Sequence, residues 1–278
     1  MAPREMLESS KEILNKAITN FRPKAIVMMF SGGDDSLTTY TVAQELGLKF
    51  DAVIHGNTRT GIPQTTEFAC KYAEKCKDRL LIADAGTAYD DYVLRKGFFG
   101  AGETAHNYAY HVLKIQHFRS VVSRNLRKRR RNFPILFING ARRKESARRE
   151  RTMVNPYKSD PAQQNNIWVN LINEWDKQTC HEYLSGNGIK RNPVSINLCR
   201  SGECMCGTMQ SKGDRIEASY FYPDWAKWIN ELEKEVVKRF PWKWGESISK
   251  GRLMEKSGQL NLFETFQPMC TGCKINAE

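Results

Sequence analysis

Short runs of apolar residues recur along the first part of the chain, and polar, helix-like segments separate them. The runs are AIVMMF (25–30), FDAVIH (50–55), RLLIAD (79–84), PILFIN (134–139) and IWVNLI (167–172). Nearly continuous apolar runs of this length are typical of strands that are buried on both faces of a parallel sheet. The alternation therefore predicts an α/β fold, with a parallel sheet covered by helices on both faces.

The segments between these runs carry helix signals. SLTTYTVAQELGL predicts a helix that is capped at Ser36 and stops at Gly47, and PQTTEFACKYAEKC predicts another after the second strand. In folds of this class, ligands bind at the carboxyl ends of the strands. The stretch SGGDDS (31–36) follows the first strand, so we expect it to face a ligand.

The pattern changes after about residue 175. Gly, Asn, Pro and Cys punctuate residues 185–213, and PDWAKWINELEKEVVKRF (223–240) predicts a Trp-rich amphipathic helix. We therefore expect two parts: an α/β domain at 1–180 and a smaller cysteine-rich region at 181–278.

Charge adds a preference for anionic partners. The 278 residues include 43 Lys and Arg against 31 Asp and Glu, which leaves a net charge of +12. Part of the excess is local, because the run RKRRR lies at 127–131. This run predicts either a solvated helix face or a contact with nucleic acid or nucleotide. No apolar stretch has the length of a membrane span and no signal-peptide core is visible, so a cytoplasmic protein without a membrane partner is expected.

The SGGDDS stretch predicts a phosphate site. Gly32 and Gly33 let the backbone approach an anion closely, while Ser31, Ser36 and the N–H groups of the following helix supply donors. The Walker A pattern is absent, and a simple tight turn is the alternative. The loop also carries two carboxylates, Asp34 and Asp35, and a carboxylate beside phosphates can hold a metal that bridges them.

A second basic motif, GARRKESARR (140–149), follows the strand at 134–139. Guanidinium groups suit phosphate oxygens, and Glu145 can hold one of them in place. An exposed basic helix start is the alternative.

Five of the eight cysteines fall in two groups, C-x4-C-x-C and C-x2-C. Four thiolates suit Zn²⁺ or an iron–sulfur cluster, so we expect a metal site formed by Cys204, Cys206, Cys270 and Cys273, with Cys199 as a substitute. Reduced cysteines without a metal, or cysteines that carry sulfur, are the alternatives.

These stretches together resemble a known family. SGGDDS is similar to the S-G-G-x-D-S signature of PP-loop ATP pyrophosphatases, which cleave ATP between the α and β phosphates. HGNTRTGIPQTTEF (55–68) and GARRKESARR resemble the branch of that family that is similar to phosphoadenosine phosphosulfate (PAPS) reductases, although Gln64 replaces the usual Glu. EWDKQTCHEYL (174–184), followed by RNPVS (191–195), is a weaker match to the same branch.

The resemblance implies roles for particular residues. Asp35 would hold the Mg²⁺ that bridges the phosphates of ATP, and Arg142 and Arg149 would stabilise the departing pyrophosphate. Asp34 is the variable position of the signature, and its carboxylate would face water or share the metal. The implied nucleotide contacts are Ser31, Gly32, Gly33, Asp34, Asp35, Ser36, His55, Thr58, Gly140, Arg142, Arg143, Glu145, Ser146 and Arg149. For the cysteines, the resemblance favours a [4Fe–4S] cluster over zinc.

The intact signature favours cleavage of ATP, because a reductase substrate has no pyrophosphate to release. With its basic surface and clustered cysteines, the chain looks like the ATP pyrophosphatase component of bacterial DNA phosphorothioation systems. That resemblance implies DNA as substrate, with a cysteine desulfurase and other sulfur-transfer subunits as partners. The alternatives are a PAPS or APS reductase, a tRNA-thiolating enzyme, and a non-enzymatic, cluster-bearing subunit that binds nucleic acid. The sequence leaves the oligomeric state open.

Overall fold

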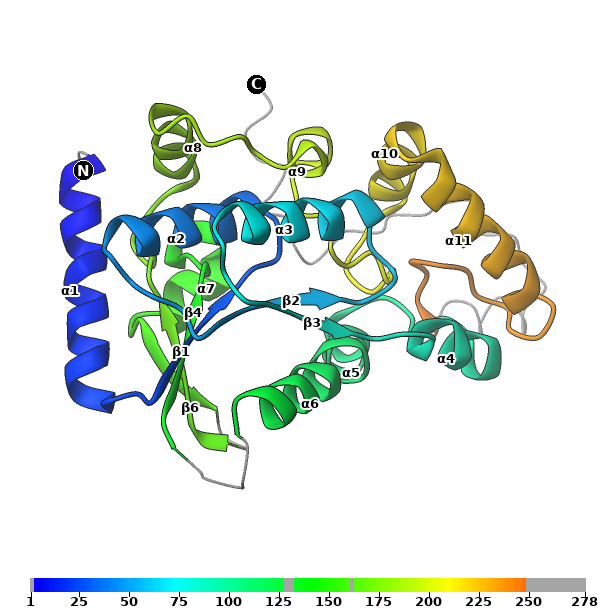
Figure 1. The fold of residues 1–278 in the computed structure, drawn as a ribbon. Coiled ribbons are helices and arrows are strands. Elements are labelled where there is room, and N and C mark those ends of the chain that lie inside the picture. Colours follow the sequence, from blue (N-terminus) through cyan, green and yellow to red (C-terminus); the bar gives the residue numbers. More distant parts are fainter. Residues whose placement is uncertain (1–2, 128–132, 161–162, 249–278) are drawn as a thin grey trace.

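The structure is a computed structural model that describes residues 3–127, 133–160 and 163–248. A six-stranded sheet forms its centre, in the order β3-β2-β1-β4-β6-β5 (Figure 1). The strands are β1 (Ala25–Met29), β2 (Ala52–Asn57), β3 (Leu80–Asp84), β4 (Ile135–Asn139), β5 (Tyr157–Asp160) and β6 (Gln163–Asn170). All the predicted strands are therefore present, and the α/β prediction is confirmed.

The central strand β1 pairs in parallel with two neighbours, so that Val27 lies opposite Ala52 on β2 and Phe137 on β4. Among the strands that the structure describes, β5 alone runs antiparallel, at the edge of the sheet beside β6. The sequence analysis missed β5 because its residues, YKSD, are mostly polar and none of them is buried. An edge strand needs no continuous apolar run.

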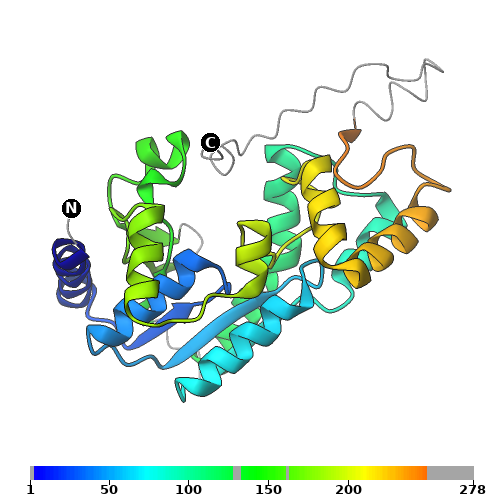
Figure 2. The same cartoon turned by 90° about the horizontal axis from the view of Figure 1, so that it is seen from above.

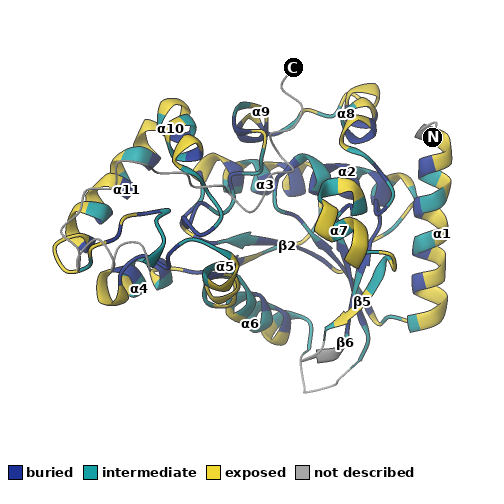
Figure 3. Cartoon of the chain, turned by 180° about the vertical axis from the view of Figure 1, so that it is seen from behind, coloured by how far each residue is buried: buried dark blue, intermediate teal, exposed yellow. Residues whose placement is uncertain are grey.

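Helices cover both faces of the sheet. The core on one face joins β1 and β4 to α1 (Pro3–Phe21), α2 (Asp34–Glu45), α3 (Pro63–Lys75) and α8 (Lys177–Gly186). The core on the other face joins the sheet to α6 (Gln116–Asn125) through Phe118 and Val122. Figure 3 shows that the buried residues lie along the inner sides of these helices. Each helix therefore buries one stripe against the sheet.

Helix α2 begins three residues earlier than predicted. Gly33 is its N-cap, and Ser36 lies within the first turn, where its hydroxyl donates to the Gly33 carbonyl at 2.9 Å. The predicted cap at Ser36 is wrong, because both aspartates already have helical geometry. The acidic side chains suit the positive end of the helix.

A third core lies at the end of the molecule opposite α1 (Figure 2). It contains Trp225, Trp242 and Trp244, whose indole N–H groups donate to the carbonyls of Thr60, Phe98 and Met205. The elements there are α4 (Ala88–Lys96), α5 (Glu103–Tyr110), the π-helical turn η1 (His111–Ile115), α9 (Pro193–Leu198), α10 (Lys212–Phe221) and α11 (Pro223–Val236).

The predicted Trp-rich helix is α11, and its buried face includes Trp225, Ile229 and Leu232. The third core combines residues from both sides of position 180, so the hydrophobic core is not divided there. The division into domains at 1–180 and 181–278 stays a prediction. No helix in the part of the chain that the structure describes is long and apolar enough to cross a membrane.

Candidate nucleotide site

A cleft of about 1260 Å³ opens at the carboxyl ends of β1 and β4. The loop after β1 forms one wall of it through Ser31, Gly33 and the first turn of α2. Gly32 takes a positive φ of 78°, which favours glycine, and this lets the chain turn sharply from strand to helix. The sequence-predicted phosphate loop therefore lies in a cleft of nucleotide size.

The N–H and hydroxyl groups of the loop bond to one another at the edge of the cleft. The hydroxyls of Ser31 and Ser36 lie 3.0 Å apart, and the Gly33 N–H is 3.4 Å from the Ser31 oxygen. The first N–H groups of a helix have no partner within the helix, so the start of α2 adds further donors and a positive dipole end. An anion placed here would meet several hydrogen-bond donors at once.

Asp35 and Arg142 form an ion pair at the mouth of the loop, with Nε to Oδ1 at 2.8 Å. The Asp35 side chain remains 28% exposed, whereas that of Arg142 is only 6% exposed. Burial alone would lower the pKa of Arg142, but the Asp35 carboxylate outweighs burial and raises that pKa. The structure thus places two predicted catalytic residues in direct contact, and Arg142 stays charged.

The segment from Gly140 onward joins the basic motif to the loop. A Cβ at Gly140 would lie 2.7 Å from the Asp35 carbonyl oxygen, so only glycine permits this approach. Arg149 contacts Glu145. Burial raises the pKa of Glu145, and the charge of Arg149 opposes that rise. Both side chains line the cleft.

Two predicted contacts in this motif have other positions. Arg143 does not line the cleft, because its Nε donates to the Glu150 carbonyl and its Nη1 lies 3.8 Å from Glu174. Ser146 is the N-cap of α7 (Ala147–Thr152) and accepts from the Arg149 N–H at 3.2 Å. Both residues shape the motif and do not line the cleft. The basic residues missed by the predicted site, Lys144 and Arg148, do line the cleft.

The second aspartate of the loop is held by protein groups. Arg191 donates to both oxygens of Asp34, at 2.9 and 2.6 Å, and His181 lies 3.0 Å from Oδ2. The Asp34 side chain is 13% exposed and also borders the cleft. Both oxygens of its carboxylate are therefore engaged by protein side chains. Sequence analysis had found the RNPVS stretch that contains Arg191 but had given it no role.

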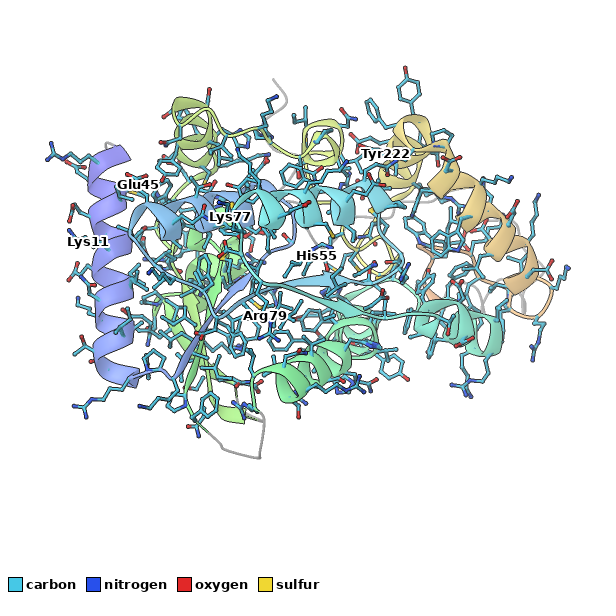
Figure 4. All side chains as sticks on the ribbon, in the orientation of Figure 1. Lys11, Glu45, His55, Lys77, Arg79 and Tyr222 are labelled. Atoms are coloured by element: carbon cyan, nitrogen blue, oxygen red, sulfur yellow. The ribbon has the colours of Figure 1, made fainter. Side chains whose placement is uncertain are left out.

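His55 and Thr58 lie beneath the site, not in it. Figure 4 shows His55 between β2 and α3, and it is completely buried. Its Nδ1–H donates to the Phe30 carbonyl at 2.8 Å and its Nε2 accepts from Thr66, an arrangement that burial favours by lowering the histidine pKa. Thr58 is also buried and donates to the Glu203 carbonyl at 2.8 Å. The predicted contact of these two residues with nucleotide is corrected to a supporting role.

The cysteine loop at 199–206 packs against the nucleotide site. Thr65 donates to the Ser201 carbonyl at 2.6 Å, and the Ile62 N–H donates to the Gly202 carbonyl at 2.8 Å. A Cβ at Gly61 would lie 2.2 Å from the Glu203 carbonyl, so this contact also requires glycine. The T-R-T-G stretch found in the sequence therefore packs against the cysteine loop.

Cys204 and Cys206 lie together in this loop, while Cys199 is exposed at the cleft. The Cys206 thiol donates to Cys204 and lowers its pKa, and the Lys114 ammonium acts in the same direction against burial. The same hydrogen bond raises the pKa of Cys206. Within the described residues, no three or more His, Cys, Asp or Glu side chains form a group that could hold a metal. Two adjacent thiols supply half of a four-thiolate site, and the other predicted ligands, Cys270 and Cys273, lie outside the described residues.

Sequence analysis missed a charged pair within the cleft. Lys114, on the π-helical turn, lies 2.8 Å from Glu203, whose side chain is 9% exposed. Burial opposes the charge on Lys114, but Glu203 outweighs it and raises the lysine pKa. Lys114 belongs to no recognisable motif, and the loop that contains Glu203 was interpreted only through its cysteines.

Comparisons with solved structures give the fold. An FMN adenylyltransferase from Candida glabrata, in complex with FAD and pyrophosphate, has a TM-score of 0.51 at 11% identity over 70% of this chain and 61% of that one. PAPS reductase from Candida auris has a TM-score of 0.49 at 15% identity, over 67% and 83% of the two chains. The U34-tRNA thiolase NcsA from Methanococcus maripaludis, with its [4Fe–4S] cluster, has a TM-score of 0.45 at 13% identity, over 94% and 90%.

No curated protein matches the chain. Residues 25–208 match the phosphoadenosine phosphosulfate reductase domain, and this range contains the phosphate loop, the arginine motif and the cysteine loop. The match covers more than half of the chain, from the first strand to the residues just after Cys206. The protein therefore belongs to the phosphoadenosine phosphosulfate reductase domain family.

Proposed function

We propose that the protein cleaves ATP between the α and β phosphates and transfers AMP to an oxygen of its substrate. The observation that carries this proposal is the complete S-G-G-x-D-S loop, which lines the cleft and whose Asp35 pairs with Arg142. Such a loop is suited to a pyrophosphate that must be held and then released. Adenylyl sulfates carry no pyrophosphate that could leave.

The residues of the cleft divide this work. Gly33, Ser31 and Ser36 would bind the β and γ phosphates through their N–H and hydroxyl groups. The partly exposed carboxylate of Asp35 is an oxygen ligand of the kind that Mg²⁺ prefers, and bound Mg²⁺ would neutralise charge between the phosphates. Arg142, buried and charged, would stabilise the charge that develops on the leaving pyrophosphate.

The adenylation step balances without a redox partner. An acceptor oxygen attacks the α phosphorus, the bond from that phosphorus to the bridging oxygen breaks, and pyrophosphate leaves with the bonding electrons. Arg149, fixed by Glu145, would hold the phosphates in line during this displacement. In a separate step, the terminal sulfur of a desulfurase persulfide attacks the activated phosphorus and AMP leaves. A thiol then cleaves the remaining S–S bond, which releases the phosphorothioate and leaves a disulfide.

The proposed acceptor is the backbone phosphate of DNA, and the proposed outcome is phosphorothioation with sulfur from a cysteine desulfurase. Its support is electrostatic: Lys144, Arg148, Lys158 and Lys177 are exposed around the cleft, and the chain carries a net charge of +12. The paired thiols Cys204 and Cys206 support a metal or cluster next to the nucleotide site, with Cys270 and Cys273 as the remaining proposed ligands.

The proposal is tested by measuring pyrophosphate release from ATP in the presence of Mg²⁺ and either duplex DNA or tRNA. We expect release that depends on DNA and falls at least about 100-fold in Asp35→Ala and Arg142→Gln. Arg143→Gln is the matched control, since that neighbouring arginine lies outside the cleft, and it should retain most of the activity. Release that is equal in wild type and Asp35→Ala would refute ATP cleavage at this loop, and stimulation by tRNA alone would exclude DNA as acceptor.

A further inference from the structure

Two consecutive residues, Arg191 and Asn192, hydrogen-bond to the phosphate loop. Asn192 is completely buried, and its Nδ2 donates to the Gly32 carbonyl at 3.0 Å. Ser195, on the first turn of the following helix, adds a longer contact of 3.4 Å to the same carbonyl. Arg191 binds Asp34, two residues further along the loop. Two of the loop's residues, Gly32 and Asp34, are thus tied to one short segment.

The bond from Asn192 fixes the orientation of a catalytically important peptide unit. Peptide bonds in the described chain are trans, so the C=O of Gly32 and the N–H of Gly33 point in opposite directions. Because Asn192 holds the carbonyl toward the protein, the N–H faces the other way, toward Ser31 and the cleft. Rotation of this unit would present a carbonyl oxygen to the phosphates and repel them.

The bond from Arg191 fixes the start of α2. Both oxygens of Asp34 are engaged, and His181 on α8 provides a third contact. The neighbouring Asp35 is then left to face Arg142. The carboxylate of Asp34 therefore serves as a handle by which the loop is held.

We propose that Arg191 and Asn192 form a clamp that orients the phosphate loop, and that both are positioning residues for the pyrophosphate end of the nucleotide. The inference rests on the proposed function for its catalytic meaning. Its structural content concerns the binding of phosphate groups alone. The clamp acts on the Gly33 N–H and on the first turn of α2, and it contacts no part of the ligand itself.

Asn192→Asp separates the clamp from the structural role of Asn192. The Asn192 side-chain oxygen also caps α9 by accepting from the Val194 N–H at 3.0 Å, and aspartate keeps this cap while it loses the N–H donor to Gly32. We expect Asn192→Asp to weaken the binding of inorganic pyrophosphate and of ATP by about tenfold, the effect of one lost buried hydrogen bond. Asn192→Asp keeps the cap but buries a carboxylate against the Gly32 carbonyl, so its unfolding temperature should fall, and binding is measured well below that temperature. Asn192→Gln, which keeps an amide donor, should recover part of the affinity.

The Arg191 part of the clamp is tested by a double-mutant cycle with Asp34→Asn and Arg191→Gln. If the pair acts as a unit, the double variant should bind pyrophosphate about as weakly as either single variant. Additive losses would overturn the handle role of Asp34. Unchanged pyrophosphate affinity in Asn192→Asp would overturn the role of Asn192.

The binding assay also separates this inference from the proposed function. Wild type that binds pyrophosphate in an Asn192-dependent way, but releases none from ATP, would keep the clamp and refute the ATP cleavage. Wild type that binds neither pyrophosphate nor ATP would refute both. A drop in turnover with unchanged pyrophosphate and ATP affinity would refute the clamp and leave the proposed function in place.

Discussion

Gly140→Ala offers a sharp test of how closely the arginine motif and the phosphate loop must fit. The new methyl group would lie 2.7 Å from the Asp35 carbonyl oxygen, 2.8 Å from its carbon and 2.9 Å from the Ser36 nitrogen. All three are backbone atoms at the start of α2, so no side-chain rotation can relieve the contact. Since comfortable contacts lie at about 3.5 Å or more, β4 and α2 would have to separate by roughly 0.5–1 Å.

This separation has two costs. Overpacking of a close contact destabilises proteins by about 1–3 kcal/mol, and the shift would also pull Asp35 from Arg142. A displacement of about 1 Å in a catalytic group can lower the rate by about 100-fold. We therefore expect Gly140→Ala to lose about 1–3 kcal/mol in urea unfolding and about 100-fold in pyrophosphate release.

Gly186→Ala is the matched control, because Gly186 ends α8 without a positive φ, and a Cβ there would meet nothing within 4 Å. It should leave activity unchanged and alter stability by less than about 1 kcal/mol, in the stabilising direction. The reasoning would be refuted if Gly140→Ala matched this control in both assays. A loss of activity without a loss of stability would instead mean that the phosphate loop shifts while the packing of the hydrophobic core is unchanged.

Three further predictions concern pH, metal and salt. The pKa of His55 is lowered on folding, so wild-type stability should fall by up to about 1.4 kcal/mol per pH unit as the pH drops below about 6.5, and His55→Gln should show a shallower fall in urea unfolding. Cys204→Ser should lower the iron or zinc content of anaerobically purified protein, whereas Cys70→Ser, on α3, should not; equal metal content in both would contradict the proposed ligand. Replacing Lys144 and Arg148 by Gln should reduce the slope of log DNA affinity against log salt by about 2, and an unchanged slope would place the DNA elsewhere.

The fold could be predicted from the sequence because the strands are buried on both faces. Val27 and Met28 are inaccessible to solvent, and a strand in that position must be apolar throughout. β5 was not predicted because its residues are intermediate or exposed, and an exposed edge strand does not need a continuous apolar run. The start of α2 was misplaced because serine is a common cap, whereas the loop needs glycine at the cap so that Ser201 can pack against it.

The site could be predicted only where its residues form local motifs. The loop and the arginine motif were found, but the contact of Asp35 with Arg142 joins two strand ends that are distant in sequence. His55 was misassigned because a strand-end histidine can point either into the cleft or into the core, and the chain pattern does not distinguish the two. Asn192 carries no chemical signature of its own, and its role emerges only from the carbonyl that it holds.

The bonds between the cysteine region and the nucleotide region have a consequence for how the protein is made. Thr58 bonds to Glu203 across 145 residues, Trp225 to Thr60 across 165, and Trp242 to Phe98 across 144. Contacts of such long sequence separation form late, because closing a long loop costs conformational entropy before the contact can stabilise the fold. During synthesis the sheet can therefore assemble while the cleft still lacks one wall. Ser195, Cys199 and Glu203 line that wall, so a translation product interrupted before Ser195 would have a folded sheet beside an incomplete cleft.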